Sequence, residues 1–157
     1  YNPAMTASTI HATAVLCGMQ GIVIRGASGS GKSRLALALL ERAPFARLIG
    51  DDRVAAVAVH GRLLLRPAPS LEGLLEIRGL GIRRVPFEPV AVAHLVVDLG
   101  AADAERLPEP GASRTLIDGI SLARLPVAPG GDALALIEAF LRYGETPVEP
   151  PASLNPR

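Results

Sequence analysis

The stretch GIVIRGASGSGKSRLALALLER, at residues 21–42, decides the fold. Its first part, residues 21–25, is a short β-branched run that predicts a buried strand. Its last part, residues 34–42, carries leucines and alanines at the spacing of a buried helix. A glycine-rich loop lies between them. The stretch therefore predicts a strand, a loop and a helix in that order, which is a unit of an α/β fold.

The loop matches the eight-position Walker A pattern, and it has the strand before it and the helix after it that this pattern requires. Its glycines let backbone N–H groups point inward to bind phosphate oxygens, and the helix adds its positive N-terminal end. Lys32 would reach the β and γ phosphates of a nucleotide, and the Ser33 hydroxyl would coordinate Mg²⁺. The predicted nucleotide-binding residues are Gly26, Ala27, Ser28, Gly29, Ser30, Gly31, Lys32 and Ser33.

The basic residues support a chemical role for the loop lysine. Lys32 is the sole lysine among 16 basic residues, and all the others are arginine. Where a positive charge only solvates the surface, this chain uses arginine, so the exception indicates a need for a compact, flexible ammonium group.

Length and composition bound the class of protein. A chain of 157 residues fits one domain, and 49% hydrophobic with 20% charged residues can build a core. The formal net charge of +1 lacks the basic excess expected for binding a nucleic-acid backbone. With 3% aromatic residues and no tryptophan, stacking on single strands is also disfavoured. We expect no nucleic-acid partner.

Targeting and redox signals favour the cytoplasm. Cys17 is the single cysteine and cannot form an internal disulfide, and no secretory signal or bilayer-length apolar run is present in the sequence. We expect no membrane association. A single catalytic domain is expected over residues 5–146, with residues 1–4 outside it and the proline-rich residues 147–157 as a flexible tail.

Strand patterns outnumber helix patterns in the rest of the chain, which predicts a mixed sheet rather than a uniformly parallel one. The expected elements are a strand at 10–16 in a hairpin with 21–25, a short strand at 48–50, a hairpin of 54–59 with 63–65, a helical turn or two at 71–77, a loop at 78–82, a strand at 93–99, a loop at 101–113, one or two strands within 117–125 and a helix over 132–143.

A phosphate loop alone does not distinguish a kinase from a hydrolase or a nucleotide-dependent switch. The acidic residues near the loop are needed to tell these classes apart. Asp98 follows an apolar strand and has the better local pattern for a metal-binding aspartate. The pair Asp51 and Asp52 offers two roles in one step, since one carboxylate can hold the metal while its neighbour keeps a raised proton affinity suited to accepting a hydroxyl proton. Solvated turn residues would show the same local pattern.

Four motifs in order resemble one known family. They are Ile10-His11-Ala12, the loop GASGSGKS at 26–33, GDDRV at 50–54 and LLEIRGLGI at 74–82, of which the last is the most diagnostic. Together they resemble the HPr kinase/phosphorylases, which phosphorylate a serine of the small phosphocarrier protein HPr. The likeness extends from about residue 8 to residue 143.

The resemblance implies an α/β P-loop kinase fold like that of phosphoenolpyruvate carboxykinase, ATP and Mg²⁺ as cofactors, an HPr-like protein as partner and a homo-hexamer. It implies that Asp52 is the acid/base residue and that Asp51 lies near metal and nucleotide. The remaining implied site residues are Glu76 as a second Mg²⁺ ligand, His11 as a charge partner and Arg106 as a phosphate clamp. Each of these three could instead be an ordinary structural or solvated residue, as we expect for His60 and His94.

Two departures from the family pattern bear on activity. Longer members carry an additional N-terminal domain, so this chain resembles the short, catalytic form. Ala128 and Gly131 stand where the family bears arginines in a loop associated with dephosphorylation. Because phosphate attack on phosphoserine gathers several anions, this loss argues against the reverse, phosphorylase reaction.

Two other functions remain compatible with the residues. A small-molecule P-loop kinase would need an arginine-rich lid and a closed acceptor pocket. A regulatory module would bind ATP or phosphate without transferring anything.

Overall fold

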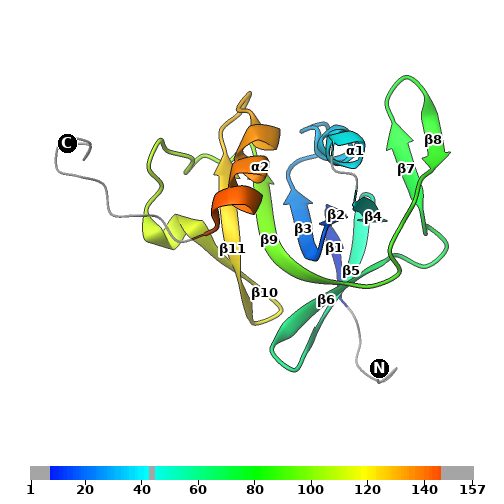
Figure 1. Cartoon of the computed structure of the whole chain (residues 1–157), viewed down its shortest axis with the longest axis horizontal. Coiled ribbons are helices and arrows are strands. Elements are labelled where there is room, and N and C mark those ends of the chain that lie inside the picture. The colour runs from blue at the N-terminus through cyan, green and yellow to red at the C-terminus, as the bar shows by residue number, and fades with distance from the viewer. Residues whose placement is uncertain (1–7, 43–44, 146–157) are drawn as a thin grey trace.

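The computed structural model describes residues 8–42 and 45–145. Its elements are β1 (Ser8–His11), β2 (Thr13–Cys17), β3 (Gln20–Arg25), α1 (Lys32–Arg42), β4 (Ala46–Gly50), β5 (Arg53–Val59), β6 (Arg62–Pro67), β7 (Leu74–Ile77), β8 (Gly81–Arg84), β9 (Ala91–Leu99), a 3₁₀ turn η1 (Pro110–Ser113), β10 (Arg114–Ile117), β11 (Ile120–Val127) and α2 (Ala133–Tyr143) (Figure 1). Residues 1–4 and 147–157, expected to flank the domain, lie outside the described ranges.

The sheet is mixed, as predicted. Seven of its nine strands follow the order β1-β5-β6-β9-β3-β2-β4, and β11, with β10 beside it, pairs with β9 as well. β3 and β11 run parallel to β9, whereas the other pairings are antiparallel. β7 and β8 form a separate two-stranded hairpin, which projects from the sheet in Figure 1.

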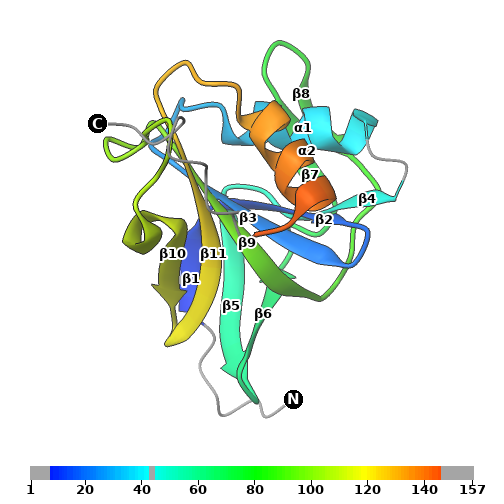
Figure 2. The same cartoon turned by 60° about the vertical axis from the view of Figure 1, so that its left-hand side comes forward.

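Both helices cover one face of the sheet (Figure 2). On that face, Ile22 and Ile24 of β3 pack with Leu39 of α1 and Ile137 of α2, and all four are at most 2% exposed. Val23 points to the opposite face, into a second apolar core with residues of β5, β6 and β10. Strand β3 is therefore buried on both faces, and the loop that follows it starts from a rigid base.

The closing helix forms as its sequence predicts. The Asp132 side chain accepts a hydrogen bond from the Ala135 N–H at 3.0 Å and caps α2, and Gly144 ends the helix. Arg42 of α1 and Glu138 of α2 form an ion pair at 3.4 Å across the two helices.

The structure differs from three local predictions. Residues 74–77 form β7 rather than a helical turn, because Leu75 is fully buried while its neighbour Glu76 is exposed, which is the alternation of a strand. The segment 78–82, expected to be a loop, makes the hairpin turn and enters β8 through Gly79 and Gly81, whose φ angles are 88° and 90°. The single strand expected at 10–16 is divided at Ala12 into β1 and β2, which pair with β5 and β3.

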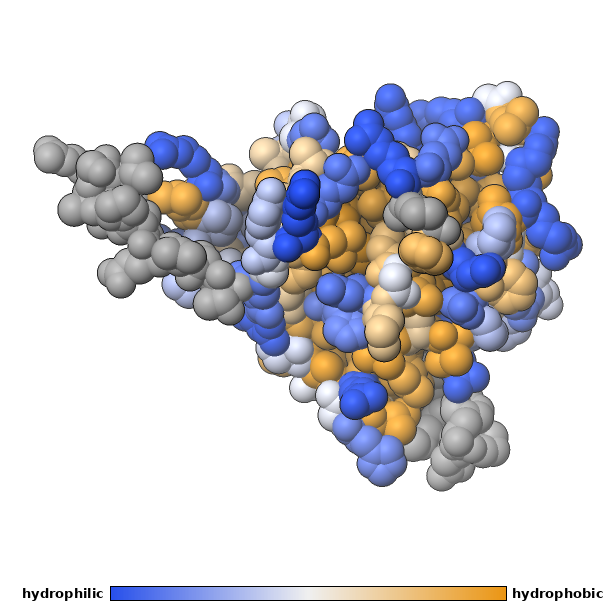
Figure 3. Space-filling model, viewed as in Figure 1, coloured by the Kyte–Doolittle hydropathy of each residue, from blue (hydrophilic) through white to orange (hydrophobic). Residues whose placement is uncertain are grey.

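Hydrophilic and hydrophobic side chains are mixed on the face of the molecule in Figure 3, including the region of the β7–β8 hairpin at the upper right. In the hairpin, Leu80 and Ile82 are 54% and 64% exposed beside exposed arginines. Within the described residues, neither helix is long and apolar enough to cross a membrane.

Cys17 is unpaired, as predicted, and lies in the helix-facing core. Burial raises the pKa of its thiol to about 11. Because the thiolate is the reactive form, this cysteine is chemically inert at neutral pH and serves the core as a small apolar side chain.

Candidate active site

Three loops meet at one edge of the sheet. β3, β9 and β11 are parallel neighbours, so their carboxyl ends lie together. The phosphate loop (residues 26–33) follows β3, residues 100–113 follow β9, and residues 128–132 follow β11. In α/β folds, this edge is where ligands bind.

The phosphate loop has a backbone that its glycines make possible. Gly31, directly before α1, has a φ of 100°, which side chains other than glycine rarely adopt. At Gly26, a Cβ atom would lie 2.5 Å from the Ser30 hydroxyl oxygen and 3.2 Å from the Leu99 Cβ, so the loop and β9 leave little room for a side chain there. Helix α1 then starts at Lys32 with its N-terminus at the loop. The loop thus fits an anionic phosphate group.

Lys32 is buried at the base of the loop. It is 7% exposed, and its Nζ donates to the carbonyl oxygens of Gly26 at 3.0 Å and Ala27 at 3.2 Å. Among the described residues, no carboxylate lies within ion-pair distance of this ammonium. A buried cation held only by neutral carbonyl groups favours the approach of an anion, since an anion completes its charge balance.

Asp51 joins the phosphate loop to two other elements. Its Oδ1 accepts hydrogen bonds from the Ser33 hydroxyl at 2.7 Å and the Thr13 hydroxyl at 2.8 Å. Its Oδ2 accepts the backbone N–H of Glu76 at 3.1 Å. Thr13 is fully buried and was not among the predicted residues. A hydroxyl in the middle of an apolar strand was the only sequence signal that could have found it.

Asp52 turns away from its neighbour. Its φ of 65° is unusual for a residue other than glycine. Two hydrogen bonds of its backbone hold this conformation. The Asp52 carbonyl accepts the Ala12 N–H at 3.2 Å, and the Asp52 N–H donates to the Thr13 hydroxyl at 3.4 Å. Its carboxylate lies 2.9 Å from His11 Nε2. The Asp52 side chain is 69% exposed and that of His11 is 50% exposed. The two adjacent carboxylates therefore face different surroundings.

The structure brings together most of the predicted residues. Ser33, Asp51, Asp52, His11 and Glu76 are linked by hydrogen bonds or by chain adjacency, Glu76 through its backbone N–H, and Glu76 is exposed. No cluster of three or more histidine, cysteine or acidic side chains suited to a metal occurs in the described ranges. Hard oxygen ligands are nevertheless present in Ser33, Asp51 and Glu76, which fits Mg²⁺, an ion that usually binds one or two carboxylates and completes its shell with water and phosphate.

Three predicted or unassigned residues lie apart from this group. Arg106 is exposed in the loop after β9, and no hydrogen bond or ion pair of its guanidinium is recorded among the described residues. His60 is exposed in the β5–β6 turn. His94 is exposed on β9 with its Nδ1 3.0 Å from the Val92 carbonyl oxygen.

Asp98, the rival metal-binding aspartate, has another partner set. Arg25 binds it through Nε at 2.7 Å and NH2 at 2.8 Å, and Arg124 Nε binds its second oxygen at 2.5 Å. Burial alone raises the pKa of this carboxyl, but the hydrogen bonds and charges of Arg25 and Arg124 outweigh it and lower the pKa. With both oxygens bound by guanidinium groups, Asp98 serves as an anion within an arginine network, which favours Asp51 over Asp98 as the metal-binding aspartate.

We expect Asp98→Asn to lower the free energy of unfolding by about 2 kcal/mol near neutral pH, because two guanidinium groups lose their shared charge partner. Since the folded-state pKa lies below that of the unfolded chain, the unfolded chain binds more protons between the two values. The wild type therefore has the higher free energy of unfolding above about pH 4, and the difference from Asp98→Asn disappears as the pH falls further. Denaturant unfolding of both forms across this range measures it, and a difference that does not depend on pH would contradict the assignment.

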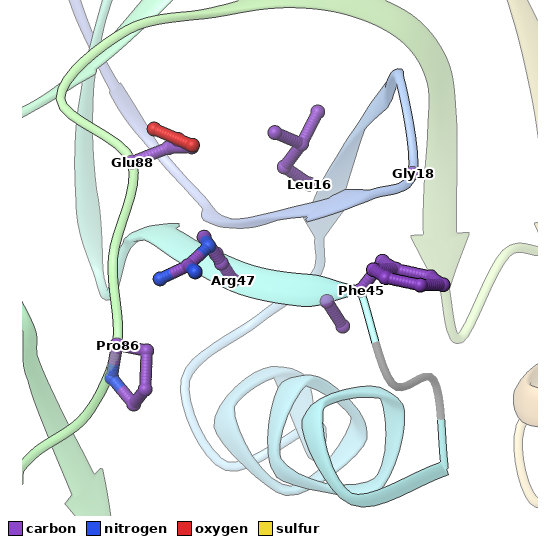
Figure 4. A pocket seen from close by; sticks show the side chains of 7 residues that line it. Leu16, Gly18, Phe45, Arg47, Pro86 and Glu88 are labelled. Carbon is purple, nitrogen blue, oxygen red and sulfur yellow. The ribbon is translucent and has the colours of Figure 1, made fainter.

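A surface hollow of about 320 Å³ lies elsewhere, lined by Leu16, Gly18, Phe45, Ala46, Arg47, Pro86 and Glu88 (Figure 4). Gly18 precedes the start of β3, whereas the phosphate loop follows its end. None of the predicted site residues lines the hollow, so it is not the phosphate site.

Comparison with known proteins decides the family. Residues 4–146 match the family model described as the HPr serine kinase C-terminal domain. The chain belongs to this family. The HPr(Ser) kinase/phosphatase from Coxiella burnetii has a similar solved structure, with a TM-score of 0.72 and 25% sequence identity, covering 86% of this chain and 94% of that one. The predicted α/β P-loop kinase fold of the phosphoenolpyruvate carboxykinase-like type is confirmed.

Named relatives of the HPr serine kinase C-terminal domain family agree. The HPr kinase/phosphorylases of Xanthomonas campestris pv. campestris (strain B100) and Xanthomonas oryzae pv. oryzae (strain PXO99A) are both 35% identical over 150 residues. The match covers 85% of this chain and 47% of each relative. The chain thus spans about half the length of the curated relatives it matches.

Proposed function

We propose that this chain is the catalytic domain of an ATP- and Mg²⁺-dependent kinase that phosphorylates a serine of an HPr-like phosphocarrier protein. The observation that carries the proposal is the continuous set of contacts from the phosphate loop through Ser33 and Asp51 to the exposed pair of Asp52 and His11. The names of the relatives support the same reaction and the same class of acceptor.

Each residue of the site has a separate role in phosphoryl transfer. The loop N–H groups and Lys32 bind the β and γ phosphates. Ser33, Asp51 and Glu76 would hold Mg²⁺, which would offset negative charge on these phosphates. The serine oxygen attacks the γ phosphorus while the bond to the β-γ bridging oxygen breaks. Asp52 accepts the serine proton as a general base, and His11 orients the Asp52 carboxylate.

Exposure of the site favours a protein acceptor over a small molecule. A small-molecule kinase encloses its acceptor, whereas the Asp52 side chain is 69% exposed. The β7–β8 hairpin, whose Glu76 N–H donates to Asp51, presents the exposed Leu80 and Ile82. A folded partner can reach a carboxylate on such an open surface.

The turn after β11 favours phosphorylation of the carrier over its dephosphorylation. The Gly131 N–H donates to the Ala128 carbonyl at 2.8 Å, and a Cβ atom at Gly131 would lie 3.0 Å from that oxygen. The turn is therefore too tight for the arginine that the family pattern places there without a backbone shift. With small residues at both positions, we propose that dephosphorylation is weak.

Incubation with γ-labelled ATP, Mg²⁺ and either an HPr-type carrier or a metabolite pool tests the proposal. We expect label on a carrier serine. Label in a metabolite would indicate the small-molecule kinase instead, and bound nucleotide without product would indicate a sensing module. A homo-hexamer and a cytoplasmic location remain predictions, the first of which light scattering of the purified chain can test.

A further inference from the structure

Four charged side chains form a network at the carboxyl edge of the sheet. They come from three neighbouring strands and one loop: Arg25 ends β3, Asp98 lies near the end of β9, Arg124 is on β11, and Asp103 is in the loop after β9. Arg25 directly precedes the first glycine of the phosphate loop. The network therefore lies next to the predicted nucleotide site without being part of it.

Arg124 is the centre of this network. Its NH1 and NH2 donate to the two Asp103 oxygens at 2.8 and 3.1 Å, its NH1 also donates to the Ala112 carbonyl at 2.9 Å, and its Nε binds Asp98. The side chain is 14% exposed. A planar guanidinium can make such a forked set of bonds, which a lysine cannot reproduce.

These contacts fix both ends of one loop. Asp103 lies near the start of the segment 100–113 and Ala112 near its end, and a backbone hydrogen bond from the Ala101 N–H to the Val127 carbonyl at 2.8 Å adds a third point. The residues between them, including Arg106, are mostly exposed. The position of Arg106 relative to the phosphate loop thus depends on polar anchors rather than on burial in the core.

We propose that Arg124, through Asp103 and Ala112, is a positioning residue that holds the Arg106 loop beside the phosphate loop. This inference rests on the proposed function and on the role that the family resemblance implies for Arg106, a contact to the transferring phosphate. The Asp103 side chain is 52% exposed, so it is not part of either core. Its hydrogen bonds with Arg124 lower the pKa of its carboxyl group, which keeps it charged as a partner for the guanidinium. Removing Asp103 therefore takes away one of the three anchors, so that the loop opens more often, while the Asp98 pairs and the cores stay intact.

Limited trypsin digestion tests the anchor without any assay of activity. In Asp103→Ala, cleavage after Arg106 should accelerate about threefold or more relative to cleavage after Arg78 in the β7–β8 turn, because cleavage follows the population of the open loop. Glu109→Ala is the matched control, since it removes the same charge from an exposed position of the same loop. Equal rates in the two variants would overturn the anchoring role.

Kinetics of the full chain test the coupling to Arg106. Asp103→Ala should lower kcat for carrier phosphorylation about threefold to tenfold with the KM for ATP unchanged, and Asp103→Ala combined with Arg106→Ala should be no slower than Arg106→Ala alone. Arg124→Lys should resemble Asp103→Ala rather than the wild type. Additive losses in the double variant would overturn the proposal. If the wild type phosphorylates no carrier, the proposed function fails, whereas the trypsin result still decides whether the loop is anchored.

Discussion

Replacing Asp52 by asparagine is expected to leave ATP affinity within about twofold and to lower the rate of phosphate transfer by about 10²- to 10⁴-fold. Asparagine has nearly the same shape and can still accept a hydrogen bond from His11, but it cannot accept the serine proton. In the proposed function the phosphate loop and Asp51 lie at the nucleotide, and the change leaves the Ser33–Asp51 contact untouched. Calorimetric titration with ATP and a labelled-transfer assay measure the two quantities separately.

The matched control is Glu72→Gln, which removes one carboxylate from an exposed position before β7. It should match the wild type in both assays. If Asp52→Asn transferred phosphate at the wild-type rate, the general base would have to be another group. A loss of ATP affinity in the same variant would instead indicate that Asp52 contacts the nucleotide.

Replacing Lys32 by methionine is expected to weaken ATP binding by about 10- to 100-fold and to reduce transfer below detection. The ammonium is buried beside the loop carbonyls, so its loss removes a charge-assisted bond to phosphate in a region that water reaches poorly. Methionine fills a similar volume and leaves no buried charge. Folding stability should therefore be unchanged or higher, because only neutral carbonyls compensate the wild-type charge.

Arg34→Met is the control for Lys32→Met, since Arg34 is exposed on the same helix two residues further on. It should bind ATP like the wild type. Thermal denaturation of both variants separates a lost contact from a lost fold. A Lys32→Met variant that is folded and still binds ATP normally would remove Lys32 from the nucleotide site.

The parts of the site that could be predicted from the sequence depend on local spacing. The phosphate loop, its lysine and the helix after it are consecutive, so their geometry follows from glycine and helix preferences alone. The family motifs further identified Asp51, Asp52 and His11, and the structure pairs His11 with Asp52 and Asp51 with Ser33. Their chemical roles remain predictions.

The parts that could not be predicted depend on strand register. Asp98 follows an apolar strand like a metal ligand, and only the pairing of β9 with β3 and β11 shows that Arg25 and Arg124 flank it. Residues 74–77 resembled a helical turn because their strand character comes from packing of Leu75 against the helix-facing core. Long-range contacts of this kind override local propensity.

Strand β9 contributes Leu95 and Val97 to the helix-facing core and Ala93 and Val96 to the opposite one. The two hydrophobic cores thus share strand β9. If one core unfolds, the other loses packing partners. The chain should consequently melt cooperatively, in a single transition, and a destabilising change far from the nucleotide would be felt throughout the molecule.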